Sequence, residues 1–275
     1  MNKEYIEVRE FHQAFNHPVA DKPISLTEER AKKRYAWMLE EINEFLDAVK
    51  EQDIVEQADA MIDTIYFALG TLVEMGVQPD ILFKIVQHAN MSKLFPDGNP
   101  HYNEMGKVIK PENWQDPHPK LAIAIENMSV NNTIDTNSAD FEINYQFGEV
   151  KKFHQAFNHP VADKPISLTE ERAKKRCAWM LEEINEFLDA VKEQDIVEQA
   201  DAMIDTIYFA LGTLVEMGVQ PEQLFDIVQH ANMSKLFPDG KPHYNEMGKV
   251  IKPENWQDPH PKLELAIRRM KRWFK

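Results

Sequence analysis

Cysteine is nearly absent from this sequence, and several other features are missing altogether. The single cysteine, Cys177, excludes an intrachain disulfide framework and any zinc site built on cysteine. No segment resembles a signal peptide, and no uninterrupted apolar run reaches the length of a membrane span. No alternating apolar run is long enough to predict a sheet. These absences favour a cytoplasmic, all-α protein with no membrane partner.

Positive charge is also scarce, with 31 Lys and Arg against 46 Asp and Glu, which gives a net charge of −15. Such a chain repels nucleic-acid backbones and anionic lipids, so neither is expected as a partner. A phosphorylated small molecule remains compatible with this charge, provided that a metal cation accompanies it. The hydrophobic content of 43% with 28% charged residues is typical of a globular protein.

The sequence contains two near-identical copies of one unit. Residues 11–125 recur at 153–267 with a constant offset of 142, and seven positions differ. Between the copies lies a polar stretch with no periodicity and the composition of a flexible linker. We therefore predict one module at 1–128, a linker at 129–142 and a second module at 143–275. Two copies are too few for a solenoid, so we expect an intrachain pseudo-dimer, with further homodimerisation left open.

Each copy is predicted to form a four-helix bundle. Residues Ser25–Glu28 have the pattern of a capping box before a long helix. Asp53 is expected to cap the next helix, and Pro79 occupies the first turn of another. The tail from Phe95 to about Pro119 is rich in Pro, Gly and Asn, and it is predicted to be ordered but not helical. In the first copy the predicted helices cover roughly 3–16, 25–52, 53–76 and 79–95.

Acidic residues crowd two of these helices, with nine carboxylates and one lysine in residues 39–63. On the second helix, Glu40 and Glu44 lie opposite the apolar side. On the third helix, Glu56, Asp59 and Asp63 fall within an arc of roughly 60°. The simplest interpretation is that these are the solvated outer faces of amphipathic helices.

The sequence after residue 60 argues against that interpretation. Asp63 is the only charge between residues 60 and 73, and Phe67 and Gly70 lie on its side of the helix. A helix that is apolar all round is covered by protein. Carboxylates held together away from water must take up protons or bind a cation. Magnesium fits, because it is usually held by a few carboxylates and several waters. The expected ligand pairs are Glu41 with Glu44, and Glu56 with Asp59.

Four further side chains are candidates for binding a ligand. Asn90 and Lys93 lie on the inward side of the fourth helix, where Lys93 could neutralise the acids or hold a phosphate. A lysine that snorkels at a helix end is an equal alternative. Lys33 and Trp37 follow the same side of the second helix as Glu41. Trp37 could stack on a base, although packing in the core or an interface is the favoured interpretation.

These residues resemble a known family. EEINE at 40–44 and EQAD at 56–59 match the pattern EExxE, spacer, ExxD of the MazG-like all-α nucleoside triphosphate pyrophosphatases, which include phosphoribosyl-ATP pyrophosphatase and the dimeric dUTPases. NMSKLFPDGNPHYNEMGKVIKP at 90–111 is similar to the subgroup often labelled Cof-like, in the phosphoribosyl-ATP pyrophosphatase-like branch. The resemblance covers essentially all of both copies. The label implies no haloacid-dehalogenase chemistry, because the DxDx[TV] motif is absent.

The resemblance implies a magnesium-dependent hydrolase that cleaves the α–β phosphate bond of a nucleoside triphosphate, with Mn²⁺ as a substitute metal. Carried over by position, the metal ligands are Glu41, Glu44, Glu56, Asp59, Glu183, Glu186, Glu198 and Asp201, with Asp63 and Asp205 as additional ligands or supporting groups. Glu40 and Glu182, or a carboxylate beside the attacking water, are the expected bases, and Lys93 and Lys235 are expected to stabilise the departing pyrophosphate. The expected substrate-binding residues are Asn90, Lys107, Lys110, Lys33, Trp37, Asn232, Lys249, Lys252, Lys175 and Trp179.

Other functions remain to be weighed against this one. A di-iron or di-manganese carboxylate bundle would carry a Glu-x-x-His motif, which no predicted helix contains. A non-catalytic module that binds nucleotides or a partner protein would keep the same fold. Phosphoribosyl-ATP is an alternative substrate, since nothing in the sequence identifies the base or the sugar.

Overall fold

The structure is a computed structural model that describes residues 1–104, 108–133, 142–245 and 250–271. Every regular element in these residues is a helix, which confirms the all-α fold and the tandem arrangement. The first copy contributes α1 (Asn2–Ala14), α2 (Glu28–Lys50), α3 (Ile54–Met75), α4 (Pro79–Met91) and α5 (His118–Val130). The second copy contributes α6 (Ile143–Ala156), α7 (Glu170–Glu193), α8 (Ile196–Met217), α9 (Glu222–Met233) and α10 (His260–Met270).

Local sequence signals explain where the long helices begin and end. The Thr27 hydroxyl accepts a hydrogen bond from the Arg30 amide and caps α2. The cap is therefore Thr27, and the predicted capping box at Ser25 was wrong by two residues. Asp53 caps α3 as predicted, because its carboxylate accepts from the Val55 and Glu56 amides. Gly76 ends α3 with a φ of 67°, a conformation that favours glycine.

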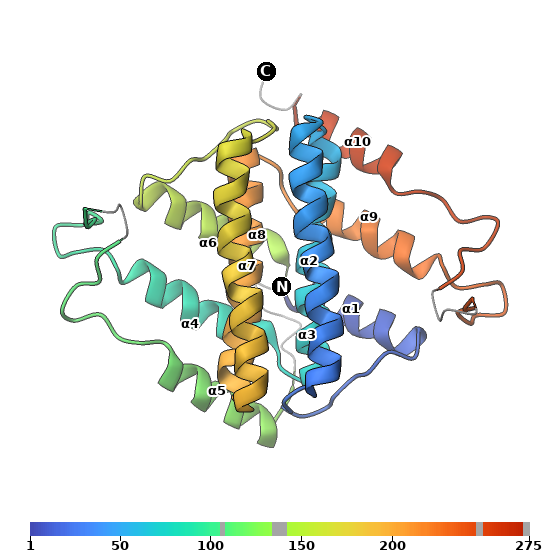
Figure 1. Ribbon diagram of the computed structural model, residues 1–275, viewed down its shortest axis with the longest axis horizontal. Helices are drawn as coiled ribbons and strands as arrows, with labels where there is room; N and C mark the ends of the chain where they lie inside the picture. Colours follow the sequence, from blue (N-terminus) through green and yellow to red (C-terminus); the bar gives the residue numbers. More distant parts are fainter. Residues whose placement is uncertain (105–107, 134–141, 246–249, 272–275) are drawn as a thin grey trace.

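The centre of the molecule is a four-helix bundle to which each copy supplies two helices. The helix pair α2 and α3 packs against the pair α7 and α8, with α2 beside α7 and α3 beside α8 (Figure 1). The segment before α2 meets the junction between α7 and α8. The Ser25 hydroxyl donates to the carbonyl of Gln194, the C-cap of α7, at 3.4 Å, and the Leu26 amide donates to the side chain of Gln199 in the first turn of α8 at 3.2 Å. Helix α3 is buried on nearly every side, as its apolar sequence predicts.

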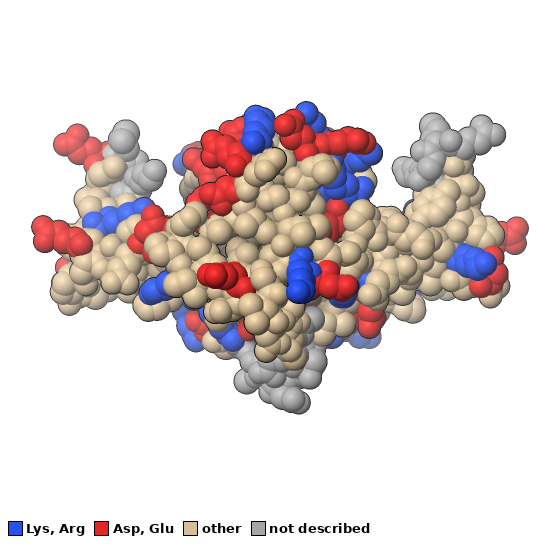
Figure 2. All heavy atoms as spheres, turned by 90° about the horizontal axis from the view of Figure 1, so that it is seen from below, with Lys and Arg blue, Asp and Glu red and all other residues tan. Residues whose placement is uncertain are grey.

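The shorter helices are exchanged between the copies. Helices α3 and α4 are bent by 117° across the Gly76–Pro79 turn, and α8 and α9 are bent by 120°. As a result, α4 and α5 pack against α8, while α9 and α10 pack against α3 (Figure 1). Seen from below, two lobes flank the central body, and acidic and basic side chains are interspersed over this face (Figure 2). Each lobe therefore mixes helices from both copies.

Two details differ from the sequence expectation or lie beyond it. A fifth helix, α5 or α10, follows the predicted non-helical tail of each copy, whereas four helices per copy were predicted. Most of the predicted linker, residues 134–141, lies outside the described residues. Within the described ranges, no single helix is long and apolar enough to span a membrane, and the two bent pairs meet that test only by length and composition when taken together.

Candidate functional site

Ten carboxylates form two acid strips between paired helices. We define the first strip as Glu41, Glu44, Glu56, Asp59 and Asp63, which lie on α2 and α3. The second strip lies on α7 and α8 and consists of Glu183, Glu186, Glu198, Asp201 and Asp205. In each strip the two glutamates nearest the mouth are exposed, whereas the other three acids are half-buried. The strips thus run from solvent into the protein, as the sequence predicted.

Burial and mutual repulsion make the ionised form of these acids unfavourable. Burial raises the pKa of Glu41, and repulsion from Asp63, Glu44 and Asp59 raises it further. Burial also raises the pKa of Asp59, with added repulsion from Asp63 and Glu56. The second strip shows the same directions at Glu183 and Asp201. The acids therefore favour protonation or a counter-charge.

One oxygen in each strip lacks a partner. Asp59 Oδ1 and its counterpart Asp201 Oδ1 are buried, and no donor among the described residues forms a hydrogen bond with either. Buried polar atoms are normally satisfied, so an orphaned carboxylate oxygen indicates a missing proton or cation. The donor set fits a hard cation such as magnesium, because every candidate ligand is an oxygen.

The carboxylates do not form a closed metal cage. Among the described residues, no three His, Cys, Asp or Glu side chains converge closely enough to hold an ion as they stand. Magnesium tolerates this arrangement better than a cage-forming metal would, since it usually keeps several waters and binds one or two carboxylates. The residues therefore fit a magnesium ion in their chemistry and charge, but their side chains would have to move closer together to bind it.

Lysine and asparagine reach each strip from the other copy. Burial raises the pKa of Asp63, and the positive charge that offsets this effect belongs to Lys235, two residues after the end of α9. Lys93 plays the same part for Asp205. Each lysine donates to the asparagine one turn earlier, Lys93 to Asn90 and Lys235 to Asn232, both at 2.7 Å. Each site is therefore composite, with acids from one copy and amine and amide groups from the other.

A histidine from the other copy also reaches each strip. His260, the first residue of α10, lies with Nδ1 2.5 Å from Oε1 of Glu56. Asp258, two residues earlier, adds a negative charge close to Asp59. The same arrangement joins His118 to Glu198 at 2.5 Å. These residues were not predicted from the sequence, although the repeated Asp-Pro-His-Pro at 116–119 and 258–261 is a signal that points to them.

An aromatic pair adjoins the deep end of the strip. Trp37 lies one turn before Glu41, and its ring stacks on Phe67 with 5.8 Å between centroids. Arg30 and Arg34 both lie 5.2 Å from the centroid of Trp37. The buried Glu74 fixes these arginines, because it accepts two hydrogen bonds of 2.6 Å from Arg30 and one of 3.3 Å from Arg34. This arginine cluster was not predicted from the sequence, because the ion pairs with Glu74 that neutralise its charges form only in the fold.

The remaining candidates lie further out or outside the described residues. Glu40 and Glu182 are exposed on the outer sides of α2 and α7. Lys33 and Lys175 form exposed ion pairs with Glu29 and Glu171. Lys110 Nζ lies 3.8 Å from the centroid of Trp114, and Lys252 has the same relation to Trp256 at 3.7 Å. Trp179 stacks on Phe209 as Trp37 does on Phe67. Lys107 and Lys249 fall outside the described residues.

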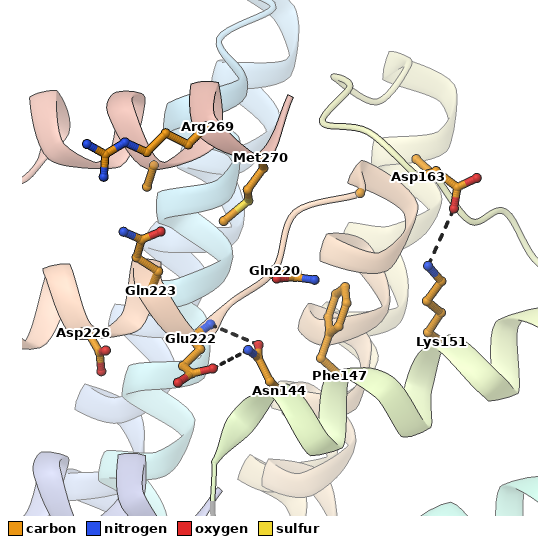
Figure 3. A pocket seen from close by; sticks show the side chains of 13 residues that line it. Asn144, Phe147, Lys151, Asp163, Gln220, Glu222, Gln223, Asp226, Arg269 and Met270 are labelled. Carbon is orange, nitrogen blue, oxygen red and sulfur yellow. Dashed lines mark hydrogen bonds and ion pairs between the residues drawn. The ribbon is translucent and has the colours of Figure 1, made fainter. Parts of the chain in front are cut away.

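A cavity of about 620 Å³ lies between α6, α9 and α10 (Figure 3). It is lined by mixed charges, among them Lys151 and Asp163, whose charged atoms are 3.7 Å apart. None of the acid-strip residues lines this cavity. The corresponding cavity beside α1 has about 310 Å³ and is lined in part by Asn132, which donates to the Asp21 carbonyl at 2.9 Å. Because the two cavities differ while the strips match, the cavity is not the site that the copies share.

Comparison with known proteins gives a consistent match for both copies. The family model described as phosphoribosyl-ATP pyrophosphohydrolase matches residues 8–90 and 150–232, which together exceed half of the chain. A crystal structure from Exiguobacterium sp. 255-15, provisionally assigned as an NTP pyrophosphohydrolase, is 35% identical. The match covers 48% of this chain and 98% of that one, with a TM-score of 0.30, so the relative has about the length of one copy. The comparison with curated proteins finds no match.

Proposed function

Because the chain belongs to the phosphoribosyl-ATP pyrophosphohydrolase family, we propose that it hydrolyses the α–β phosphate bond of a nucleoside triphosphate with the help of magnesium. The products are a nucleoside monophosphate and pyrophosphate. The observation that carries the proposal is the composite site, where the orphaned Asp59 Oδ1 and the half-buried acids face Lys235 of the other copy. Carboxylates that can bind a cation thus lie beside a lysine that can bind phosphates.

The division of charge within the site supports a bound polyphosphate with its cation. A triphosphate carries about four negative charges at neutral pH, and an acid strip alone would repel it. When bound, magnesium supplies the counter-charge, polarises the phosphate and lowers the pKa of a water. The residues proposed to hold it in the first strip are Glu41, Glu44, Glu56 and Asp59, with Asp63 supporting them. The second strip would use the corresponding residues.

The chain's own groups then have distinct tasks. Asn232 and Lys235 are proposed to bind the β- and γ-phosphates over the first strip, and Lys235 stabilises the charge that develops on the departing pyrophosphate. Glu40, or another carboxylate beside the attacking water, takes the proton as the water oxygen bonds to the α-phosphorus and the P–O bond to the leaving group breaks. Lys110 and Lys252, at the end of the NMSKL to KVIKP segments, are proposed as further phosphate contacts.

The base is proposed to lie against the aromatic pair next to the strip. Trp37 is half-buried, lies one helical turn from Glu41 and stacks on Phe67, so the part of its ring that stays exposed is the proposed contact for a base. The same relation holds for Trp179 in the second copy. Lys33 and Lys175 lie nearby in sequence but form exposed ion pairs, so they would have to leave Glu29 and Glu171 to meet a substrate.

A substrate panel tests this function. The full chain is incubated with each canonical NTP and dNTP, and with phosphoribosyl-ATP, in Mg²⁺ and in EDTA, and the products are separated. We expect monophosphate and pyrophosphate in Mg²⁺ and no turnover in EDTA. Diphosphate with orthophosphate would contradict the proposed bond. Tight nucleotide binding without any turnover would instead assign the chain to the non-catalytic alternative.

A further inference from the structure

We infer that His118 and His260 are positioning residues, each holding a carboxylate of the opposite copy's acid strip in place for the cation. This inference rests on the proposed metal site and deepens it. It concerns the Asp-Pro-His-Pro turns, which open α5 and α10 and which neither the family motifs nor the acid strips include. The contact is the same in both halves of the molecule, 2.5 Å from Nδ1 to a glutamate oxygen.

The turn is built to fix the direction of the histidine. The Asp258 carboxylate accepts a hydrogen bond of 2.9 Å from the His260 backbone amide, and Asp116 does the same for His118. Pro259 is the N-cap residue with a φ of −68°, and Pro261 follows inside the first turn. Two prolines and the aspartate hydrogen bond leave the backbone little conformational freedom to lose when the turn docks.

Helix electrostatics alone do not account for a histidine here. The first turn of a helix favours acidic side chains and disfavours cations, yet the first turns of α5 and α10 contain no acid. The partner that suits His260 is Glu56, on a different helix and in the other copy. The contact therefore belongs to the junction between α10 and α3, where the acid strip opens to solvent.

The geometry leaves one glutamate oxygen for a cation. His260 contacts Oε1 of Glu56, so Oε2 remains to bind a metal. Metal-binding carboxylates are commonly held by an outer hydrogen bond that orients them, and loss of such a partner typically weakens metal binding about 10-fold to 100-fold. His260 and His118 are placed to supply that bond.

Binding of Mn²⁺ alone tests the inference without any substrate. Free Mn²⁺ is measured by electron paramagnetic resonance during titration of the wild-type chain and of the single variant His260→Ala. Because His118 is untouched, we expect half of the sites to keep the wild-type affinity and half to bind roughly 10-fold more weakly. A titration of His260→Ala that matches the wild type would overturn the inference, as would a wild-type chain that binds no Mn²⁺.

Two replacements of similar bulk separate positioning from packing. Asn places its amide nitrogen near the position of histidine Nδ1, whereas Gln places it near Nε2. His260→Asn is therefore expected to restore Mn²⁺ affinity, and His260→Gln to behave like the alanine variant. Equal affinities for Asn and Gln variants would contradict the role of Nδ1. This comparison also holds if His260→Ala fails to fold.

A double-mutant cycle identifies the partner across the copies. His260→Ala should add little to the effect of Glu56→Gln, because His260 acts through the Glu56 carboxylate that it contacts. In a Glu198→Gln background, the two effects should add, since they fall on different strips. Full additivity with Glu56→Gln would overturn the inference. Absence of nucleotide turnover in the substrate panel would leave all of these Mn²⁺ results standing, so the two proposals fail separately.

Discussion

The two copies of the repeat agree at their acid strips and differ at the cavities beside α1 and α6. His260–Glu56 and His118–Glu198 have the same length, as do Lys93–Asn90 and Lys235–Asn232. In contrast, the cavity beside α6 is about twice the volume of the one beside α1. The exchanged helices explain the agreement, because every strip depends on side chains from both copies. A change in either copy alters a site that the other copy shares.

The seven positions that differ between the copies avoid the composite sites. Three of them lie on α4 and α9. Glu222, Gln223 and Asp226 of the second copy correspond to Asp80, Ile81 and Lys84 of the first. Glu222 and Asp226 help to line the larger cavity (Figure 3). The remaining four are Tyr35 with Cys177, Asn99 with Lys241, Ala122 with Glu264, and Ile123 with Leu265. Pairs of substitutions that combine residues of the two copies therefore test whether each site is shared between the copies.

The largest effect is expected from pairs of substitutions that disable both composite sites. Glu41→Gln damages the first strip, and Lys93→Met removes the lysine beside the second strip. Together they should reduce turnover by roughly 100-fold or more, since each removes charge stabilisation at a different site. Glu41→Gln with Lys235→Met damages one site twice, so about half of the activity should remain. Initial rates at saturating substrate and Mg²⁺ measure both.

The reversed pattern would show that each site is confined to one copy. In that case Glu41→Gln with Lys93→Met would leave about half of the activity, and Glu41→Gln with Lys235→Met would abolish it. Glu41→Gln with Glu183→Gln serves as the reference for complete loss under either arrangement. Full activity of that reference variant would remove both glutamates from the mechanism.

Sequence patterns were sufficient for the helices and the acids but not for their partners. The 3.6-residue period, the cap at Asp53 and the first-turn proline Pro79 located α3 and α4, and the apolar run around Asp63 indicated that the acids enter the protein. The exchange of α4 and α9 could not be predicted, because a bend of 117° is set by tertiary packing around the Gly76 turn. The sequence predicted Lys93 beside an acidic cluster but not which copy supplies the acids, and the fold places it beside Asp205.

Rising pH is expected to weaken the fold when no divalent cation is present. Burial and neighbouring carboxylates raise the pKa of Glu41 to about 9, whereas an unfolded glutamate titrates near its ordinary value of about 4. The folded state therefore binds more protons between these limits. The stabilisation that protonated Glu41 contributes is complete below the pKa of the unfolded glutamate, and it is lost as the pH rises through the pKa of Glu41 in the folded state. For one excess proton, the loss is about 1.4 kcal/mol per pH unit, or roughly 2–4 °C in Tm.

Melting curves from pH 5 to pH 9 in EDTA and in excess Mg²⁺ measure this effect. We expect Tm to fall with pH in EDTA and to fall less in Mg²⁺, because the cation binds the ionised acids of the folded state. Glu41→Gln with Glu183→Gln should flatten the EDTA profile, since two of the raised groups are gone. A Tm that rises over this range in EDTA would contradict the assignment.

A smaller loss of stability is expected from Gly70→Ala. A Cβ at this position would overlap the Arg34 guanidinium and lie 2.9 Å from Nε2 of His12. Arg34 cannot move aside freely, because it is buried and donates to Thr71 at 3.0 Å and to the Phe67 carbonyl. Alanine gains about 1 kcal/mol of helix propensity, but overpacking of this kind costs about 1–3 kcal/mol. The net free energy of unfolding should fall by about 1 kcal/mol in urea titrations.

Gly148→Ala provides the matched control for that substitution. Gly148 also lies within a helix, α6, but nothing stands within 4 Å of the added methyl group. It should therefore leave stability unchanged or raise it by up to about 1 kcal/mol. Equal effects of the two substitutions would show that the Arg34 contact does not constrain the helix.

The smallest expected effect compares Glu7 with its counterpart Glu149. Glu7 Oε2 is buried without a partner, and burial, opposed by Lys3 and strengthened by Asp226, raises its pKa to about 7. Glu149 instead pairs with Lys152 at 2.5 Å, where the first copy has Glu10.

At pH 8, Glu7→Gln removes a poorly solvated charge and should raise Tm slightly, whereas Glu149→Gln should lower it slightly. The gain from Glu7→Gln should shrink at pH 6, because the native carboxyl is then largely protonated. Scanning calorimetry at both pH values resolves shifts of about 1–2 °C. Shifts in Tm of the same sign at pH 8 would mean that the surroundings of Glu7 on α1 and Glu149 on α6 are electrostatically alike, although Lys152 replaces Glu10.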